Sequence, residues 1–142
     1  MKILVPIDGS ECALRAVAHA IKIIGACAGH DKPEVHLLNV QPSVRGAVGM
    51  FIDKEDIKDY HREEGMKALE SARKLLDEAG LEHTIHIDVG TPGQVIDRYS
   101  RELGVEQIVM GTRGLGNISD IVLGSTSDEL LRLTSIPVLL VK

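Results

Sequence analysis

Glycine and small hydroxyl residues gather in the C-terminal third of the chain in a pattern that could bind phosphate. Gly111, Gly114 and Gly116 stand close together, and the run Gly124-Ser125-Thr126-Ser127 follows them. Glycine permits positive φ angles and a close approach of a ligand to backbone N–H groups. A helix that begins at the later run would offer free N–H groups and the positive end of its dipole to an anion. Gly111 and Gly114 alone fit a tight turn as well, so the later run is what favours a phosphate site.

The same region lacks the side chains that fast phosphoryl transfer needs. The sequence has no G-x-x-x-x-G-K-[ST] motif and no G-x-G-x-x-G motif after its first apolar run. Arg113 is the one cation between Gly111 and Leu123. Phosphoryl transfer depends on positioned cations and an oriented nucleophile. We therefore expect binding with slow turnover or none, and no catalytic residue.

Asp8 follows the first apolar run, where it could contact a ligand or start a turn. The run at 3–7 ends in Asp8-Gly9-Ser10, which is a turn and helix N-cap signal. Ligands of open parallel sheets bind beyond the carboxyl ends of the strands, and acids at such ends usually face the crevice. This favours contact of Asp8 with a ribose or a divalent ion over a purely local role.

The histidines and cysteines do not have the spacing of a metal site or a disulfide. His36 with His86, or His83 with His86, could form a two-histidine metal site. Positions in a strand or at the surface without a metal are favoured over such a site. Cys12 and Cys27 fall in one predicted helix, about 22 Å apart at the rise of an α-helix. That separation is far beyond the reach of a disulfide.

The composition limits the classes of partner. The chain has 142 residues, of which 44% are hydrophobic, and a formal net charge of −5. No basic cluster is present that would capture nucleic acid or an acidic membrane surface. No run is long enough to span a membrane, and the apolar run at 1–5 is too short for a signal peptide. We expect a cytoplasmic protein that binds neither nucleic acid nor membrane.

Apolar periodicity alternates between strands and helices along the whole chain. Strands are predicted at 3–7, 35–40, 82–89, 105–110 and 136–141, and helices at 11–28, 53–79, 92–103 and from 125 onward. The inward faces of the first two helices are predicted to carry Leu14, Val17, Ala18, Ile21, Ile24 and Ala28, and Ile57, Ala68, Leu69, Ala72, Leu75, Leu76 and Ala79. Ser125 and Asp128 have the spacing of a capping pair. Alternating elements predict one doubly wound α/β domain over 1–142, with a parallel sheet and helices on both faces.

Three segments together resemble one known family. Gly111-x-x-Gly114, nine residues and then Gly124-Ser125 resemble the nucleotide-binding signature of the ATP-binding branch of the universal stress protein family. The segments 5–10 and 136–141 resemble the opening and closing strands of that family. The resemblance covers essentially the whole chain in the expected order. Asn39 departs from it, because the family often has histidine there.

The resemblance implies a fold and a ligand. The fold would be an open parallel five-stranded sheet of order 3-2-1-4-5, adenine nucleotide α-hydrolase-like, and the ligand would be ATP, with or without Mg²⁺. Asp8 would lie near the ribose, and the backbone of Val40 would bind the adenine edge. The implied binding residues are Pro6, Ile7, Asp8, Val40, Met110, Gly111, Arg113, Gly114, Gly116, Gly124, Ser125, Thr126 and Ser127.

The resemblance also implies a homodimer through 136–141 and a role as a nucleotide-responsive regulator or stress-tolerance factor. A binding-ordered loop at 115–123 would be its responsive part. Two rivals are a nucleotide-independent interaction module, which the glycine signature disfavours, and an adenylate-forming or ATP-hydrolysing enzyme. The enzymes tend to carry a histidine-rich signature after the first strand, and Gly9-Ser10-Glu11-Cys12-Ala13 contains none. A phospho-receiver domain is set aside, because Asp8 is the only acid at the first strand.

Overall fold

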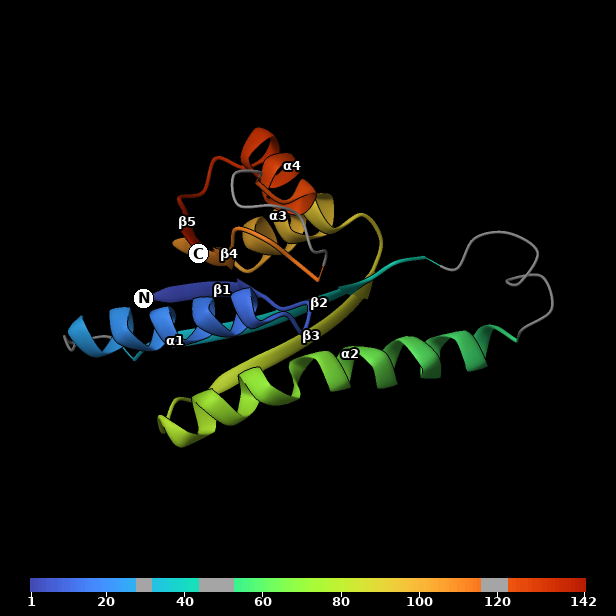
Figure 1. Ribbon diagram of the computed structural model, residues 1–142, viewed down its shortest axis with the longest axis horizontal. Helices are drawn as coiled ribbons and strands as arrows, with labels where there is room; N and C mark the ends of the chain where they lie inside the picture. Colours follow the sequence, from blue (N-terminus) through green and yellow to red (C-terminus); the bar gives the residue numbers. More distant parts are fainter. Residues whose placement is uncertain (28–31, 44–52, 116–122) are drawn as a thin grey trace.

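The computed structural model describes residues 1–27, 32–43, 53–115 and 123–142. Its elements are β1 (Lys2–Pro6), α1 (Glu11–Ala26), β2 (Glu34–Gln41), α2 (Lys54–Glu78), β3 (His83–Val89), α3 (Pro92–Glu102), β4 (Gln107–Gly111), α4 (Ser125–Leu133) and β5 (Val138–Val141) (Figure 1). Their types and order are those predicted from periodicity. None of the helices in these ranges is long and apolar enough to cross a membrane.

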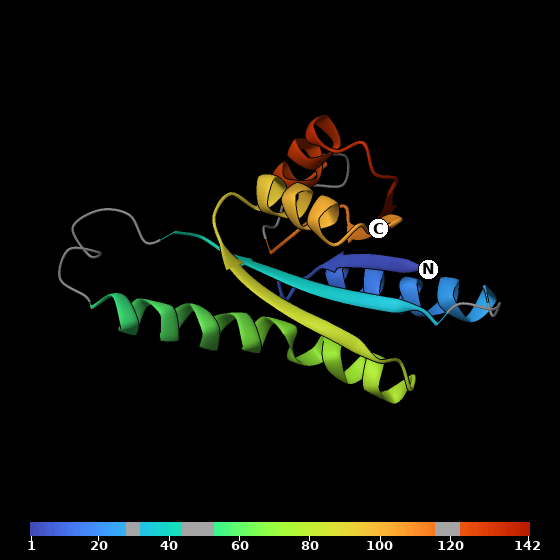
Figure 2. The same cartoon turned by 180° about the vertical axis from the view of Figure 1, so that it is seen from behind.

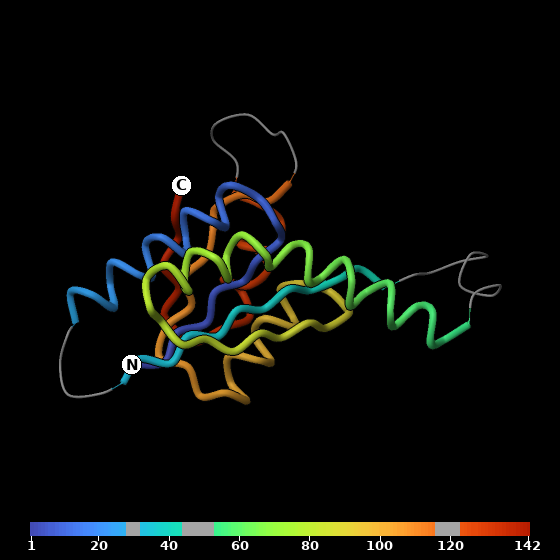
Figure 3. Tube along the Cα trace, turned by 90° about the horizontal axis from the view of Figure 1, so that it is seen from below, coloured from blue at the N-terminus to red at the C-terminus, as the bar shows by residue number. Residues whose placement is uncertain are grey.

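The strands form one parallel sheet of order β3-β2-β1-β4-β5. Helices α1 and α2 cover one face of the sheet, and α3 and α4 cover the other (Figures 1 and 2). Figure 3 shows α1 and α2 running beside each other across the strands. The doubly wound fold and its strand order are therefore confirmed.

Two apolar cores separate the sheet from its helices. Ile3 and Val5 of β1 pack with residues of α1 and α2, such as Val17 and Leu69. Leu4, which points to the opposite face, packs in the core that α3 and α4 cover. Because both faces of β1 are buried, its sequence is a continuous apolar run without polar alternation.

Three strands are shorter than predicted: β3 by its first residue only, and β4 and β5 each for a local reason. Strand β4 begins two residues after Val105, whose N–H donates to the Ser100 carbonyl in the turn that ends α3. Strand β5 begins at Val138 because Pro137 has no N–H to donate, although its carbonyl accepts from Ile108. As predicted, β5 lies at an edge of the sheet.

The start of α4 differs from its prediction. Gly124 is the N-cap residue, and Ser125 is the first residue of the helix. The expected capping pair of Ser125 and Asp128 is therefore wrong, and Asp128 instead pairs with Arg132 at 2.8 Å, one turn further along. No side chain among the described residues caps this helix. Within the described ranges, its first N–H groups therefore have no side-chain partner.

Candidate nucleotide site

The sheet parts at its carboxyl end between β1 and β4. Their pairing is limited to Ile3 with Gln107 and Leu4 with Ile108. Beyond these pairs β1 leads to α1 on one face, whereas β4 leads to α4 on the other face. Such a switch point leaves a crevice in which ligands of doubly wound sheets bind.

A cavity of about 710 Å³, which we call the carboxyl-end pocket, occupies this crevice. The structure brings all but one of the expected binding residues to its wall. Those lining it are Pro6, Ile7, Asp8, Val40, Met110, Gly111, Arg113, Gly114, Gly124, Ser125, Thr126 and Ser127. Gly116, most of the 115–123 loop and most of the segment between Gln41 and Phe51 lie outside the described residues.

The Asp8 carboxylate has the local turn role, and its second oxygen faces the crevice where a ligand contact is expected. Its Oδ1 accepts a hydrogen bond from the Ser10 N–H at 2.9 Å, and the Ser10 hydroxyl then caps α1 by accepting from Ala13 N–H at 3.2 Å. Its Oδ2 lies 2.5 Å from where a Cβ on Gly114 would be. One oxygen therefore holds the turn while the other reaches across the crevice to the glycine loop.

The glycines of the pocket allow close approach and do not use positive φ. Neither Gly111 nor Gly114 has a positive φ, so that part of the expectation is wrong for both. A Cβ on Gly111 would lie 2.9 Å from the Cys12 Sγ and 3.0 Å from its carbonyl carbon. A Cβ on Gly124 would lie 3.0 Å from the Thr112 carbonyl oxygen. Glycine is required here because β4, α1 and the start of α4 meet at backbone distance.

The start of α4 is fixed to the end of β4 by two hydrogen bonds. Gly124 N–H donates to the Thr112 carbonyl at 2.8 Å, and the Ser127 hydroxyl donates to the Gly111 carbonyl at 3.1 Å. Ser125 and Thr126 lie between these anchors and line the pocket. The positive end of the helix is thereby held at the pocket wall, where an anion would be stabilised.

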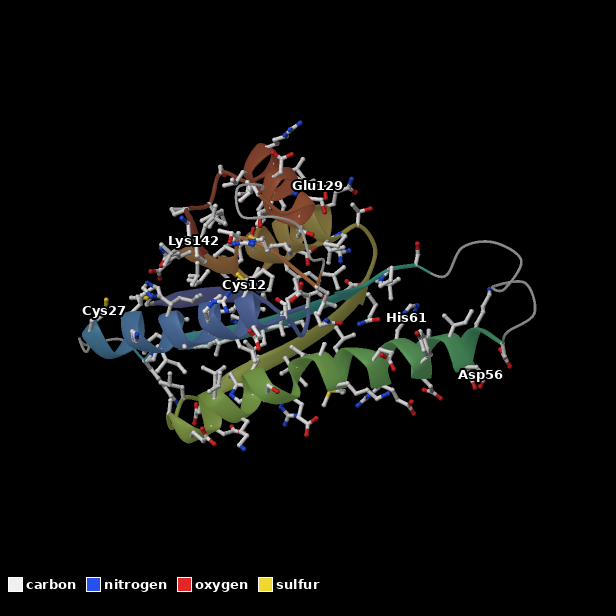
Figure 4. All side chains as sticks on the ribbon, in the orientation of Figure 1. Cys12, Cys27, Asp56, His61, Glu129 and Lys142 are labelled. Atoms are coloured by element: carbon white, nitrogen blue, oxygen red, sulfur yellow. The ribbon has the colours of Figure 1, made fainter. Side chains whose placement is uncertain are left out.

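The three helices that begin near the crevice differ in what accepts hydrogen bonds from their first N–H groups. Ser10 caps α1, as described above. The Glu129 carboxylate of α4 accepts from the Gly93 N–H at 3.2 Å in the first turn of α3, and Figure 4 shows Glu129 beside that helix. In the part of the chain that the structure describes, only α4 of these three has neither a capping side chain nor a carboxylate bonded to its first N–H groups, although Asp128 lies in its first turn. The start of α4 is therefore the candidate position for an anion.

The charges at the wall do not by themselves favour a polyanion. Asp8, Arg113 and Asp128 line the pocket, so its acids outnumber its cations. The buried Cys12 thiol behind Gly111 donates to the Val141 carbonyl at 3.2 Å. Burial raises the pKa of this thiol. Hydrogen bonds from the Arg113 N–H and from the side chain and backbone of Thr112 outweigh burial, so the pKa is lowered. Because the acids at the pocket wall outnumber the cations, backbone dipoles must supply most of the attraction for phosphate.

Several wall residues were not anticipated from the sequence: Ala13, Leu38, Pro92, Ile96, Leu115, Leu123 and Asp128. Leu38 could have been found, because residues two apart in a strand share a face and Val40 was expected. Pro92 and Ile96 of α3 carry no local signal. They reach the wall only because the crossover from β3 to β4 lays α3 over the centre of the sheet.

His36 and His86 do not line this pocket. His36 Nδ1 and His86 Nε2 are 3.0 Å apart in a hydrogen bond between β2 and β3. No three metal-ligating side chains cluster among the described residues. Cys12 and Cys27 are free thiols at opposite ends of α1 (Figure 4), which confirms that they do not pair.

Comparison with known proteins places the chain in a family. The model of the universal stress protein family matches residues 1–142. Universal stress protein YxiE of Bacillus subtilis is 33% identical over 152 residues, covering 99% of this chain and 98% of the relative. The solved structure of MJ0577, a universal stress protein of Methanocaldococcus jannaschii, is 32% identical with a TM-score of 0.82, covering 99% of this chain and 94% of that one.

A more distant structure shares the fold. A universal stress protein family protein from Arabidopsis thaliana, solved with AMP bound, is 22% identical with a TM-score of 0.70, covering 100% of this chain and 91% of that one. On the match to the family model and the 33% identity to YxiE, this chain belongs to the universal stress protein family.

Proposed function

We propose that the chain binds an adenine nucleotide, ATP in the first place, in the carboxyl-end pocket and acts as a nucleotide-responsive regulator in the cytoplasm. The observation that carries the proposal is the uncapped start of α4, held against β4 at the wall of a cavity that Asp8 and Val40 also line. The AMP bound to the related Arabidopsis protein supports an adenine nucleotide as the ligand class.

Each part of a nucleotide has a matching part of the pocket. Apolar side chains such as Leu38, Ile96 and Met110 would pack against the base, and the backbone of Val40 would bind its edge. Asp8 would accept hydrogen bonds from the ribose hydroxyls. The phosphates would lie at the start of α4, with Mg²⁺ offsetting the negative charge that Asp8 and Asp128 add there.

Binding without rapid hydrolysis fits the same wall. Arg113 is the one cationic side chain among the described lining residues. No lysine stands there to stabilise charge on a transferred phosphoryl group, and no described group is placed to orient an attacking water. We expect phosphate release from ATP close to the uncatalysed background. Rapid release would favour the enzyme alternative.

Titration calorimetry with Mg-ATP, AMP and cyclic AMP tests the proposal. Gly114→Val should weaken binding by more than about tenfold. The new Cβ would lie 2.5 Å from Asp8 Oδ2, so the valine side chain would displace the Asp8 carboxylate. Gly25→Val is the matched control, since a Cβ there meets nothing within 4 Å. Absence of binding by the unmodified protein to all three nucleotides would favour the nucleotide-independent module.

We also propose that β5 pairs with its copy in a homodimer. The strand is an edge with half-buried apolar residues, and Leu131 and Leu133 of the preceding helix are 45% and 49% exposed. A bare apolar edge of this kind is prone to aggregation unless it is covered. Sedimentation velocity should show a dimer, and a monomer at every concentration tested would contradict this pairing.

A further inference from the structure

The hydrogen-bond ladder between β1 and β2 ends just before Val40 of the pocket wall. Its last pair is Pro6 with Leu38, and Ile7 N–H donates to the Leu38 carbonyl at 2.8 Å. In a parallel ladder, alternate residues of a strand direct their N–H and C=O to the same neighbouring strand. Val40, two residues after Leu38, therefore directs both groups toward β1. One more step of the ladder would join Val40 N–H to the Ile7 carbonyl.

The side chain of Asn39 binds that carbonyl instead. Asn39 Nδ2 donates to the Ile7 carbonyl at 2.8 Å, and Asn39 Oδ1 accepts from Gln41 Nε2 at 2.7 Å. Asn39 is 2% exposed, so both ends of its amide are satisfied inside the protein. In the described ranges, no backbone hydrogen bond joins Val40 to β1.

We propose that Asn39 is a positioning residue for base recognition: by occupying the Ile7 carbonyl, it keeps the N–H and C=O of Val40 available to the edge of adenine. The inference rests on the proposed function. Adenine offers an acceptor at N1 beside a donor at N6, which matches the N–H and C=O of a single residue. Without the Asn39 amide, the Ile7 carbonyl would accept from Val40 N–H, and the donor for N1 would be lost.

Gln41 has a secondary role in the same arrangement. Its amide donates to Asn39 Oδ1, which leaves Asn39 Nδ2 as the end that faces Ile7. Gln41 is itself held by its carbonyl, which accepts from Gly90 N–H at 3.0 Å on the β3 side. Loss of the Gln41 side chain would remove the preference for one orientation of the Asn39 amide without removing the amide.

Hydrogen exchange tests the inference without any nucleotide. In the unliganded protein, the Val40 amide should exchange at least about tenfold faster than the Leu38 amide, because Leu38 lies inside the ladder and Val40 does not. In Asn39→Leu, which has no donor, the Val40 amide should become protected. Equal protection of the two amides in the unmodified protein would overturn the inference.

Base selectivity is the second readout. Inosine triphosphate presents a donor at N1 and an acceptor at position 6, the reverse of ATP, so the unmodified protein should prefer ATP. In Asn39→Leu and Asn39→Asp, affinity for ATP should fall about tenfold, the effect of one hydrogen bond, while affinity for inosine triphosphate stays the same. A merely structural role would weaken both nucleotides equally and leave their ratio unchanged.

Two further variants keep the test decisive. Ser100→Ala removes a buried hydroxyl that donates to the Asp97 carbonyl at 2.7 Å outside the pocket wall, and it should leave the ratio unchanged. If the Asn39 variants fail to fold, Gln41→Leu should still lower the ratio, by a smaller factor. An unchanged ratio in every folded Asn39 and Gln41 variant would overturn the inference while ATP binding stands. Failure of the unmodified protein to bind ATP would contradict the proposed function and base recognition with it, while the exchange experiment would still decide whether Asn39 keeps the Val40 N–H out of the ladder.

Discussion

Two hollows of about 710 Å³ each lie at opposite ends of this sheet, and they differ in what lines them. The carboxyl-end pocket is lined by glycines, apolar side chains and the start of α4. The second, which we call the amino-end hollow, lies at the beginnings of β2 and β3 and the end of α2. It is lined by Lys32, Pro33, Glu34, Val35, His36, Asp77, Gly80, Leu81, Glu82, His83 and Thr84. Of the ionisable side chains that line the two hollows, most are therefore in the amino-end hollow, which we do not propose as the ligand site.

The difference follows from the direction of the strands and helices. In the amino-end hollow, polar side chains already have partners: Lys32 Nζ lies 2.5 Å from Glu82 Oε2, and His83 Nδ1 lies 3.2 Å from the Leu81 carbonyl. The end of α2 also brings the negative end of a helix dipole there. In the carboxyl-end pocket, the backbone donors at the start of α4 have no side-chain partner among the described residues. Unused backbone groups distinguish a ligand site here better than volume or the number of ionisable side chains.

Glycine substitutions should give the largest contrast between the two hollows. Gly111→Ala should cost about 3 kcal/mol of unfolding free energy, because the new Cβ would be 3.0 Å from a backbone atom of Cys12 that cannot turn away. Gly80→Ala should cost only about 1 kcal/mol, because its φ is +67° but its Cβ meets nothing. Urea unfolding measures both, and equal costs would show that close approach does not decide the residue at 111.

The sequence predicted the order and type of the elements because their apolar patterns are strong. The prediction was less accurate for which side of a helix faces inward. Leu69 and Leu76 are buried as expected, whereas Ala18 and Ala79 are exposed, and His61 is buried without having been expected. Alanine contributes too little apolar area to fix the rotation of a helix. A histidine gives no sign in the sequence of which face it occupies.

The candidate site was predicted as far as it depends on loops that follow strands. The glycine signature and Asp8 indicated the β1 and β4 ends of the pocket. The sequence could not indicate that the Glu129 carboxylate would accept a hydrogen bond from the Gly93 N–H at the start of α3. These residues are 36 apart in the sequence and meet only through the packing of two helices. Nor could it indicate that Asn39 would bind the Ile7 carbonyl, which depends on where the ladder ends.

The pH dependence of stability should come from the amino half of the sheet and not from the pocket. Burial lowers the pKa of both His36 and His86, and Lys2 lowers that of His36 further while Glu34 acts against it. The unfolded chain takes up protons near the ordinary histidine pKa of about 6.5, whereas the native pair resists protonation. Stability should therefore be greatest above that pH and decrease as the pH falls below it.

Denaturant unfolding at a series of pH values between about 5 and 8 checks this, since that range spans the ordinary histidine titration. His86→Gln removes one titrating group and should flatten the dependence. His19→Gln, on the exposed face of α1, is the matched control and should leave the slope as it is. Asp88 and Arg98, an ion pair on the same side of β3, remain in both variants. A slope that His86→Gln does not change would assign the dependence to other groups.

Neutralising a charge in the amino-end hollow should have the smallest effect. Glu82 pairs with Lys32, and the two side chains are 78% and 74% exposed. An exposed pair contributes little because water and salt screen it and because two long side chains must be ordered. Glu82→Gln should change the unfolding free energy by less than about 0.5 kcal/mol and leave ATP affinity unchanged. A loss of ATP affinity in Glu82→Gln would mean that the hollow richer in charge takes part in binding, and the contrast drawn from strand direction would not hold.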